Sequence, residues 1–307
     1  MCCLFGLIDY GHTLSGKQKS RIISTLATAC EVRGKDATGI AYNNNGKLCI
    51  YKRPLPASLM RFKIPADAHV IMGHTRMTTQ GSAKKNHNNH PFLGQAGDDT
   101  FALAHNGVLW NDYELRHERL LPHTKIETDS YIAVQLVEQQ KALHPQSLKN
   151  MAEELEGSFC FTVLDKADNL YVVKGDNPIC IYHWPAQQIY LYASTEEILK
   201  AALAKMPVTF GKPHPVLVSE GWILKITSEA VQTMTQFDAT KLDTRWYYYS
   251  RWPVTPSVRT PLRSDSQTVQ VRHLDRRKQT LLPVVRQLKN WRGDQHTVSR
   301  HAVRVTP

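Results

Sequence analysis

The sequence lacks several patterns that mark common classes of protein. No run approaches about 18 consecutive apolar residues, so we expect no transmembrane helix and no membrane partner. The opening stretch MCCLFGLIDYG has no basic segment and only a short apolar run, which argues against a signal peptide. None of the six cysteines forms a CxxC pair, so a structural zinc site is not expected. Cysteines scattered in this way are typical of a reducing compartment, and we predict a cytoplasmic protein.

Acidic side chains are scarce in the last part of the sequence. Residues 251–307 carry 12 Lys+Arg and 3 Asp+Glu, so +9 of the +11 net charge lies there. This asymmetry predicts one domain over residues 2–245 and a basic, Pro- and Arg-rich, partly disordered tail over 246–307. The tail could stay solvated, bind an acidic partner protein or bind nucleic acid. We disfavour nucleic acid because no nucleic-acid-binding motif accompanies the charge.

The apolar periodicity predicts an α+β protein. Helical spacing is present over 17–34, 129–143, 148–157 and 194–203, and Gly34 would end the first helix. Strands are expected over 2–9, 38–53, 69–77, 101–109, 158–175, 179–194 and 221–227. Residues 78–99 are too polar and Gly-rich for a core element, so we predict a long functional loop there. Strand pairs and helix pairs segregate along the chain, which favours α+β layers over a doubly wound sheet.

Cys2 directly follows the initiator methionine. Methionine is normally removed before a small residue, which would leave Cys2 with both a thiol and a free α-amine. Their reference pKa values are about 8.5 and about 7.7–8.0, so the amine can act as the general base for the thiol. Taken alone, Cys2 could instead be a small buried residue at the start of a strand.

Five short motifs follow Cys2 in order. They are RGKDATGIA (33–41), GHTRMTTQG (73–81), NNHPF (88–92), HNG (105–107) and ETD (127–129). Together with Cys2 they resemble the class II glutamine amidotransferases, a branch of the N-terminal nucleophile hydrolases. The similarity is greatest to the glutaminase domain of glucosamine-6-phosphate synthase and covers about residues 2–245. It implies a four-layer αββα sandwich, no cofactor, and hydrolysis of L-glutamine to L-glutamate and ammonia through a γ-glutamyl thioester on Cys2.

The resemblance also implies how the substrate is bound. Arg76 of the HTR motif would bind the substrate carboxylate, which suits a planar guanidinium, and Thr79 lies in the same substrate-binding segment. Asp129 of the ETD motif would pair with the substrate ammonium. An acid at that position could also be a helix N-cap, and the two roles are compatible.

The chemical step would use the HNG motif. Its Asn106 side chain and Gly107 N–H would stabilise the oxyanion of the tetrahedral intermediate. We expect a supporting role, rather than direct chemistry, for Arg33, Gly34, Asp36 and His105. His87 and His90 have an HxxH spacing, but the family needs no metal. We therefore predict no metal site and expect His90 and His105 to be structural hydrogen-bonding residues.

Three positions depart from the family pattern. Cys3 replaces the usual Gly, so we expect a side chain that must be accommodated beside the active site. Met77 replaces a Trp and Gln80 replaces a His in the motif HTRWATHG. Loss of the Trp leaves hydrolysis intact in principle but puts its coupling to an acceptor domain in doubt.

The acceptor for the ammonia is not evident in the sequence. Residues 246–307 are too few for a sugar-isomerase or a phosphoribosyltransferase domain, so ammonia would pass to a separate acceptor enzyme or to solvent. Three alternatives stay open: an amidase for another γ-glutamyl or acyl amide, a non-catalytic amidotransferase-like binding subunit, and a nucleic-acid-binding protein on the same scaffold. The first would keep the Cys2 chemistry, and the second would fold and bind its partner without it.

Overall fold

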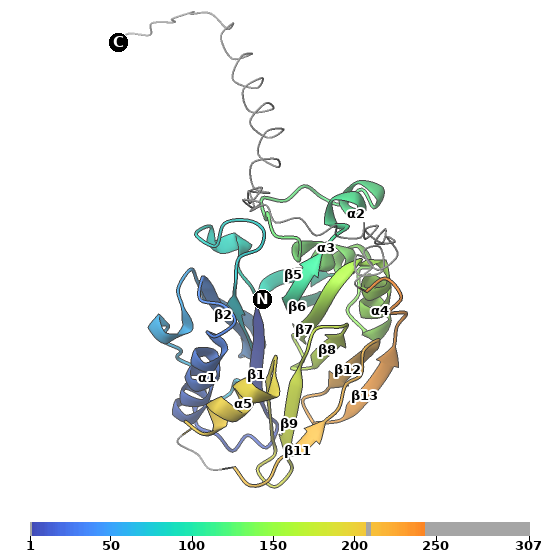
Figure 1. Cartoon of the computed structure of the whole chain (residues 1–307). Coiled ribbons are helices and arrows are strands. Elements are labelled where there is room, and N and C mark those ends of the chain that lie inside the picture. Colours follow the sequence, from blue (N-terminus) through green and yellow to red (C-terminus); the bar gives the residue numbers. More distant parts are fainter. Residues whose placement is uncertain (1, 207–209, 243–307) are drawn as a thin grey trace, which may run out of the picture. The chain divides into compact units, whose positions relative to one another are not determined.

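A computed structural model describes residues 2–206 and 210–242 of the chain. Within these ranges the strands form two sheets, and neighbouring strands run antiparallel (Figure 1). The first sheet has the order β11 (His214–Val216), β9 (Cys180–Trp184), β10 (Ile189–Ala193), β1 (Cys3–Asp9), β4 (Val70–Arg76), β2 (Ala37–Asn44), β3 (Lys47–Arg53). The second has the order β13 (Gln232–Gln236), β12 (Trp222–Ile226), β8 (Leu170–Lys174), β7 (Gly157–Asp165), β6 (Asp99–Leu109), β5 (Phe92–Ala96).

Helices cover the outer faces of both sheets. Those on the first sheet are α1 (Gly16–Cys30) and α5 (Glu196–Leu203), and those on the second are α3 (Tyr131–Gln139) and α4 (Pro145–Glu154). The shorter helix α2 (Asp112–Glu118) contacts α3, and two 3-10 turns complete the elements, η1 (Ala57–Leu59) and η2 (Asn86–Asn88). The predicted αββα sandwich is confirmed.

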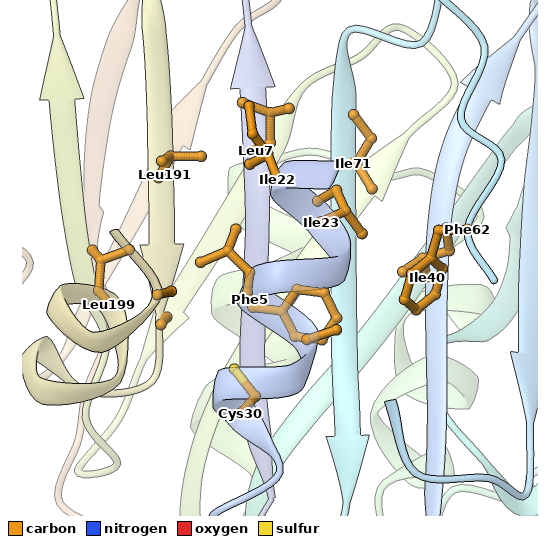
Figure 2. Close-up of a cluster of buried hydrophobic side chains, with 14 of the residues drawn as sticks. Phe5, Leu7, Ile22, Ile23, Cys30, Ile40, Phe62, Ile71, Leu191 and Leu199 are labelled. Atoms are coloured by element: carbon orange, nitrogen blue, oxygen red, sulfur yellow. The ribbon is translucent and has the colours of Figure 1, made fainter. Parts of the chain in front are cut away.

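Three apolar cores separate the four layers. Side chains alternate along a strand, so Leu4 and Ile8 of β1 point between the two sheets, whereas Phe5 and Leu7 point toward α1 (Figure 2). The third core lies between the second sheet and the helices α3 and α4. Central strands such as β1 and β4 are buried on both faces, which explains why they read as continuous apolar runs. The core between the two sheets is therefore mainly apolar, and polar side chains that face it are candidates for a functional role.

Helix α1 has clear local determinants. Ser15 caps it, because its hydroxyl accepts a hydrogen bond from the Gln18 N–H while the Gln18 side chain accepts one from the Ser15 N–H. Ile22, Ile23 and Leu26 then lie on the buried face. The helix ends at Cys30, so the prediction that Gly34 stops it is wrong.

The prediction that residues 78–99 hold no core element is wrong for their last part. Strand β5 pairs with β6 and forms one edge of the second sheet. Phe92 and Ala96 are buried, whereas Leu93 and Gln95 are exposed, which is the two-residue period of a strand with one covered face. The run is only five residues long and lies among Gly and polar residues, so its period was not recognised.

The predicted boundary at residue 245 and the tail over 246–307 lie outside the described residues and stay predictions. In the part of the chain that the structure describes, each helix is too short or too polar to cross a membrane.

Candidate active site

Cys2 lies at the amino end of β1, near the middle of the first sheet. It has the same parity along the strand as Leu4 and Ile8, so its thiol faces the layer between the sheets, and the residue is only 9% exposed. The Sγ atom accepts a hydrogen bond from the Met77 N–H at 3.4 Å. On the other side, Arg33 Nε donates to the Cys2 carbonyl at 2.8 Å. These contacts hold the sulfur at the edge of the inter-sheet layer.

Cys3 points to the opposite face of β1. Its Sγ lies 3.0 Å from the Sγ of Cys30, in the fully buried core beneath α1. The expectation that Cys3 must be accommodated beside the active site is therefore wrong, because consecutive side chains alternate between the two faces of a strand.

The turn at 33–36 supports the segment that follows β4. The Asp36 carboxylate accepts a hydrogen bond from the Thr78 N–H at 2.7 Å, and the Asp36 N–H donates to the Arg76 carbonyl at 3.0 Å. A Cβ atom at Gly34 would meet the carbonyl carbon of Arg76 at 2.4 Å, so only glycine allows this close approach. The three predicted supporting residues Arg33, Gly34 and Asp36 therefore all contact Cys2 or the backbone at Arg76–Thr78.

Arg76 lies at the end of β4 and faces the same layer as Cys2. It is 2% exposed, and within the described residues its guanidinium donates to neutral oxygens: Asn89 Oδ1 at 2.6 Å and the carbonyls of Gln80 and Gly81 at 2.5 and 3.4 Å. Among the described residues it forms no ion pair. A buried cation without a counter-ion is costly, so this guanidinium is suited to bind an anion.

Asp129 lies two residues before the start of α3 and is almost fully buried. Its Oδ2 accepts a hydrogen bond from the Leu109 N–H at 2.8 Å, and its Oδ1 accepts one from the Ser130 hydroxyl at 3.3 Å. The alternative of an N-cap is wrong, because Ser130 occupies that position. Within the described ranges Asp129 also has no cationic partner. The site thus holds one buried cation and one buried anion that do not pair with each other.

Burial raises the pKa of the Cys2 thiol. The Met77 N–H and the charge of Arg76 lower this pKa, whereas the Asp129 carboxylate raises it. Both charged groups therefore lie near enough to influence the sulfur. A thiol with a raised pKa is protonated at neutral pH and needs a base before it can act as a nucleophile.

Asn106 of β6 points from the second sheet into the layer that Cys2 faces, as Ala102 and Ala104 do. The residue is 0% exposed, and neither its Oδ1 nor its Nδ2 has a hydrogen-bond partner among the described residues. An unsatisfied buried carboxamide is unusual and points to a ligand.

Gly107 cannot be replaced without a change in the backbone. It has φ of +148°, and a Cβ atom there would lie 1.8 Å from the Ser158 carbonyl oxygen. The close approach of β7 at this point, together with the backbone conformation, explains why the motif needs glycine after Asn106.

His105 connects β6, the strand that carries the HNG motif, to Asp129 through Ser130. Its Nδ1 lies 2.7 Å from the Ser130 hydroxyl, which in turn contacts Asp129, and its Nε2 lies 3.4 Å from the Ser158 carbonyl oxygen. Burial lowers the pKa of His105, so the ring is neutral at pH 7. The hydrogen-bonding expected of His105 is therefore present.

The same expectation is wrong for His90. Neither ring nitrogen has a partner in the described part of the chain, and the ring instead packs 4.2 Å from His74 and 4.4 Å from Phe92, measured between centroids. Within residues 2–206 and 210–242, no group of three or more His, Cys, Asp or Glu side chains is placed to hold a metal ion.

The sequence analysis assigned no role to Asn89, although it quoted the motif NNHPF. The structure shows that Asn89 is the side chain that binds the Arg76 guanidinium. The signal that could have identified Asn89 is the pair of adjacent asparagines before the His-Pro dipeptide in this motif. Thr79, which the resemblance assigns to substrate binding, is exposed in the segment after β4, as are Met77 and Gln80.

Comparison with known proteins identifies the domain. A family described as "Glutamine amidotransferase domain" matches residues 74–201, which include Arg76, Asn106 and Asp129. The resemblance to the class II glutamine amidotransferases is confirmed over this region. The chain is 32% identical over 190 residues to the glutamine–fructose-6-phosphate aminotransferase (isomerizing) of Streptococcus pyogenes serotype M6, and 34% identical over 184 residues to that of Listeria innocua serovar 6a.

These alignments cover 59% and 57% of this chain and 30% of each relative, so this chain spans less than a third of their length. Among solved structures, the glutamine phosphoribosylpyrophosphate amidotransferase of B. subtilis in complex with ADP and GMP superimposes with a TM-score of 0.59 at 21% identity. That match covers 77% of this chain and 49% of the other. It supports the fold of the amidotransferase domain.

Proposed function

We propose that the amidotransferase domain hydrolyses L-glutamine to L-glutamate and ammonia, with Cys2 as the nucleophile. The observation that carries this proposal is the buried pair of opposite charges near the thiol, Arg76 and Asp129, neither of which forms an ion pair within the described residues. A free α-amino acid carries the two complementary charges, so its carboxylate would bind Arg76 and its ammonium would bind Asp129. The similar proteins are named for glutamine-dependent transfer, which agrees with this substrate.

The proposed reaction starts with removal of Met1, which leaves a free α-amine on Cys2. This amine takes the thiol proton, and the thiolate attacks the γ-carbonyl carbon of glutamine. The Asn106 Nδ2 and the Gly107 N–H donate to the resulting oxyanion. Ammonia leaves with the proton, a γ-glutamyl thioester remains on Cys2, and water hydrolyses the thioester to glutamate. We further propose that the ammonia passes to an acceptor on another protein.

Mass spectrometry with 6-diazo-5-oxo-L-norleucine, a reactive glutamine analogue, tests this function. We expect a chain without Met1 that carries one adduct, mapped to Cys2, and we expect excess L-glutamine to slow its formation. Glutamate and ammonia released from L-glutamine are measured in parallel. An adduct with no glutamine turnover would favour an amidase for a different amide, and a chain that retains Met1 without an adduct would favour the non-catalytic binding subunit.

Replacing Asn106 with alanine is expected to lower kcat for glutamine by about 10²–10³-fold, because the oxyanion forms only on the way to the tetrahedral intermediate. KM and the melting temperature should change little, since the carboxamide has no partner to lose among the described residues. Steady-state kinetics checks this expectation. Asn150→Ala on α4, whose side chain binds Gln140, is the control and should keep its kcat. An equal loss in both variants would contradict the role of Asn106.

A further inference from the structure

We propose that Lys52 positions the substrate carboxylate site by holding the segment Asn89–Pro91, which in turn holds Arg76. This role rests on the proposed function, because it concerns how Arg76 is presented to the glutamine carboxylate. Neither the sequence motifs nor the resemblance assigns anything to Lys52, which lies on β3, the edge strand of the first sheet.

The Lys52 ammonium group binds backbone carbonyls. Its Nζ donates to the Asn89 oxygen at 2.5 Å and to the Pro91 oxygen at 2.9 Å. It forms no ion pair in the part of the chain described here. The Lys52 carbonyl also accepts a hydrogen bond from Asn86 Nδ2 at 3.0 Å. Lys52 therefore binds both ends of the segment Asn89–Pro91 through its ammonium group, and it binds Asn86 through its backbone carbonyl.

A glycine beside Lys52 lets the segment approach the sheet. Gly39 of β2 pairs with Lys52 across the strands, and a Cβ atom at Gly39 would lie 2.2 Å from the His90 oxygen and 2.9 Å from Pro91 Cδ. Because no side chain intervenes, the segment packs directly against β2, within reach of the Lys52 ammonium.

Asn89 joins this segment to the substrate site. Its backbone oxygen is bound by Lys52, whereas its side-chain Oδ1 accepts the hydrogen bond from Arg76 at 2.6 Å. The Asn89 Nδ2 donates to the Ala83 carbonyl at 2.8 Å, which fixes the orientation of the carboxamide. Two hydrogen bonds therefore lead from Lys52 to the guanidinium, while Cys2 and Asn106 lie on other strands. Loss of the ammonium should weaken carboxylate binding and leave the chemical step intact.

Steady-state kinetics on Lys52→Met tests the proposal. We expect KM for glutamine to rise about tenfold, which corresponds to about 1.4 kcal/mol, and kcat to stay within about twofold. Lys52→Arg keeps a cationic donor and should restore most of the affinity. Lys47→Met, an exposed lysine on the same strand, is the matched control and should behave as the wild type.

Two thiol reagents separate positioning from general structural damage. The glutamine analogue 6-diazo-5-oxo-L-norleucine carries the α-carboxylate that Arg76 would bind. Iodoacetamide also alkylates thiols but has no α-carboxylate. In Lys52→Met, the concentration of the analogue that gives half-maximal labelling of Cys2 should rise about tenfold, and the iodoacetamide rate at Cys2 should not change. If Lys52 had only a general structural role, its replacement would change the reaction of Cys2 with both reagents.

The pH dependence of KM gives a second, independent readout. Burial, with a further contribution from the charge of Arg76, lowers the pKa of Lys52 to about 8. The other titratable groups that interact with it in the described part of the chain are His74 and His90, and burial keeps both neutral by lowering their pKa values. The ammonium is thus present below pH 8 and lost above it. KM of the wild type should rise above pH 8, and KM of Lys52→Arg should not.

The outcomes are distinguishable. A wild type that neither turns over glutamine nor reacts with the analogue at Cys2 overturns the proposed function, and the role of Lys52 with it. A wild type that does both, with KM unchanged in Lys52→Met or with kcat reduced as much as kcat/KM, overturns the role of Lys52 alone. If Lys52→Met does not fold, the comparison of wild type and Lys52→Arg across pH 8 decides.

Discussion

Replacing Cys2 with alanine is expected to abolish glutamine hydrolysis, with a loss of at least about 10⁴-fold in kcat, as is usual when a covalent nucleophile is removed. The adduct with 6-diazo-5-oxo-L-norleucine should disappear from the amino-terminal peptide. Cys3 cannot take over, because it lies on the other face of β1, 3.0 Å from the sulfur of Cys30 and fully buried. Rates of glutamate and ammonia release, together with intact-protein mass, measure the effect.

Binding of glutamine should survive in Cys2→Ala. Arg76 and Asp129 remain, and the substitution removes only one sulfur atom. Calorimetry should therefore give a dissociation constant for glutamine within a few-fold of the KM of the wild type. Cys3→Ala is the matched control and should keep both turnover and labelling. Turnover that persists in Cys2→Ala, or that is lost in Cys3→Ala instead, would contradict the assignment of Cys2 as the nucleophile.

Replacing Lys19 with methionine is expected to lower the free energy of unfolding by about 3–5 kcal/mol, because it leaves a buried carboxylate without its partner. Lys19 Nζ lies 3.0 Å from Asp9 Oδ2, and both side chains are 0% exposed. The same ammonium donates to the carbonyls of Ala66 and Ala68 at 2.6 and 2.8 Å. Methionine keeps the apolar stem and removes all three interactions. Urea denaturation gives the change in stability.

A second substitution separates the charge from the packing. In Lys19→Met/Asp9→Asn, residue 9 loses its charge but keeps an oxygen that can accept from the Thr13 N–H, which now donates to Asp9 Oδ1 at 3.1 Å. The double variant should therefore recover part of the stability lost in Lys19→Met, and a double-mutant cycle gives the coupling. Lys17→Met, an exposed lysine in the same helix, should change the stability by less than about 0.5 kcal/mol. A loss within that limit for Lys19→Met would show that the buried pair contributes little.

Sequence analysis succeeded where the signal is local. The apolar runs of β1 and β4 and the helical spacing of α1 each depend on neighbouring residues, so periodicity could locate these elements. The αββα arrangement followed from the resemblance and is confirmed by the two sheets and their helices. The functional roles of Cys2, Arg76, Asn106 and Asp129 remain predictions, although Cys2, Arg76 and Asn106 face the layer between the sheets and Asp129 lies near enough to influence the Cys2 sulfur.

Tertiary structure alone decided which residues support that layer. Lys52 and Asn89 are 37 positions apart, and nothing near either residue indicates that one binds the other. Whether the Cys3 side chain lies in the core beneath α1 depends on which face of β1 that helix covers. The edge strand β5 became recognisable only through its pairing with β6. The sequence by itself determined where the long, strongly periodic elements form and which side chains alternate along them. Which faces then meet was decided by packing two sheets against each other, because that contact depends on groups far apart in the chain.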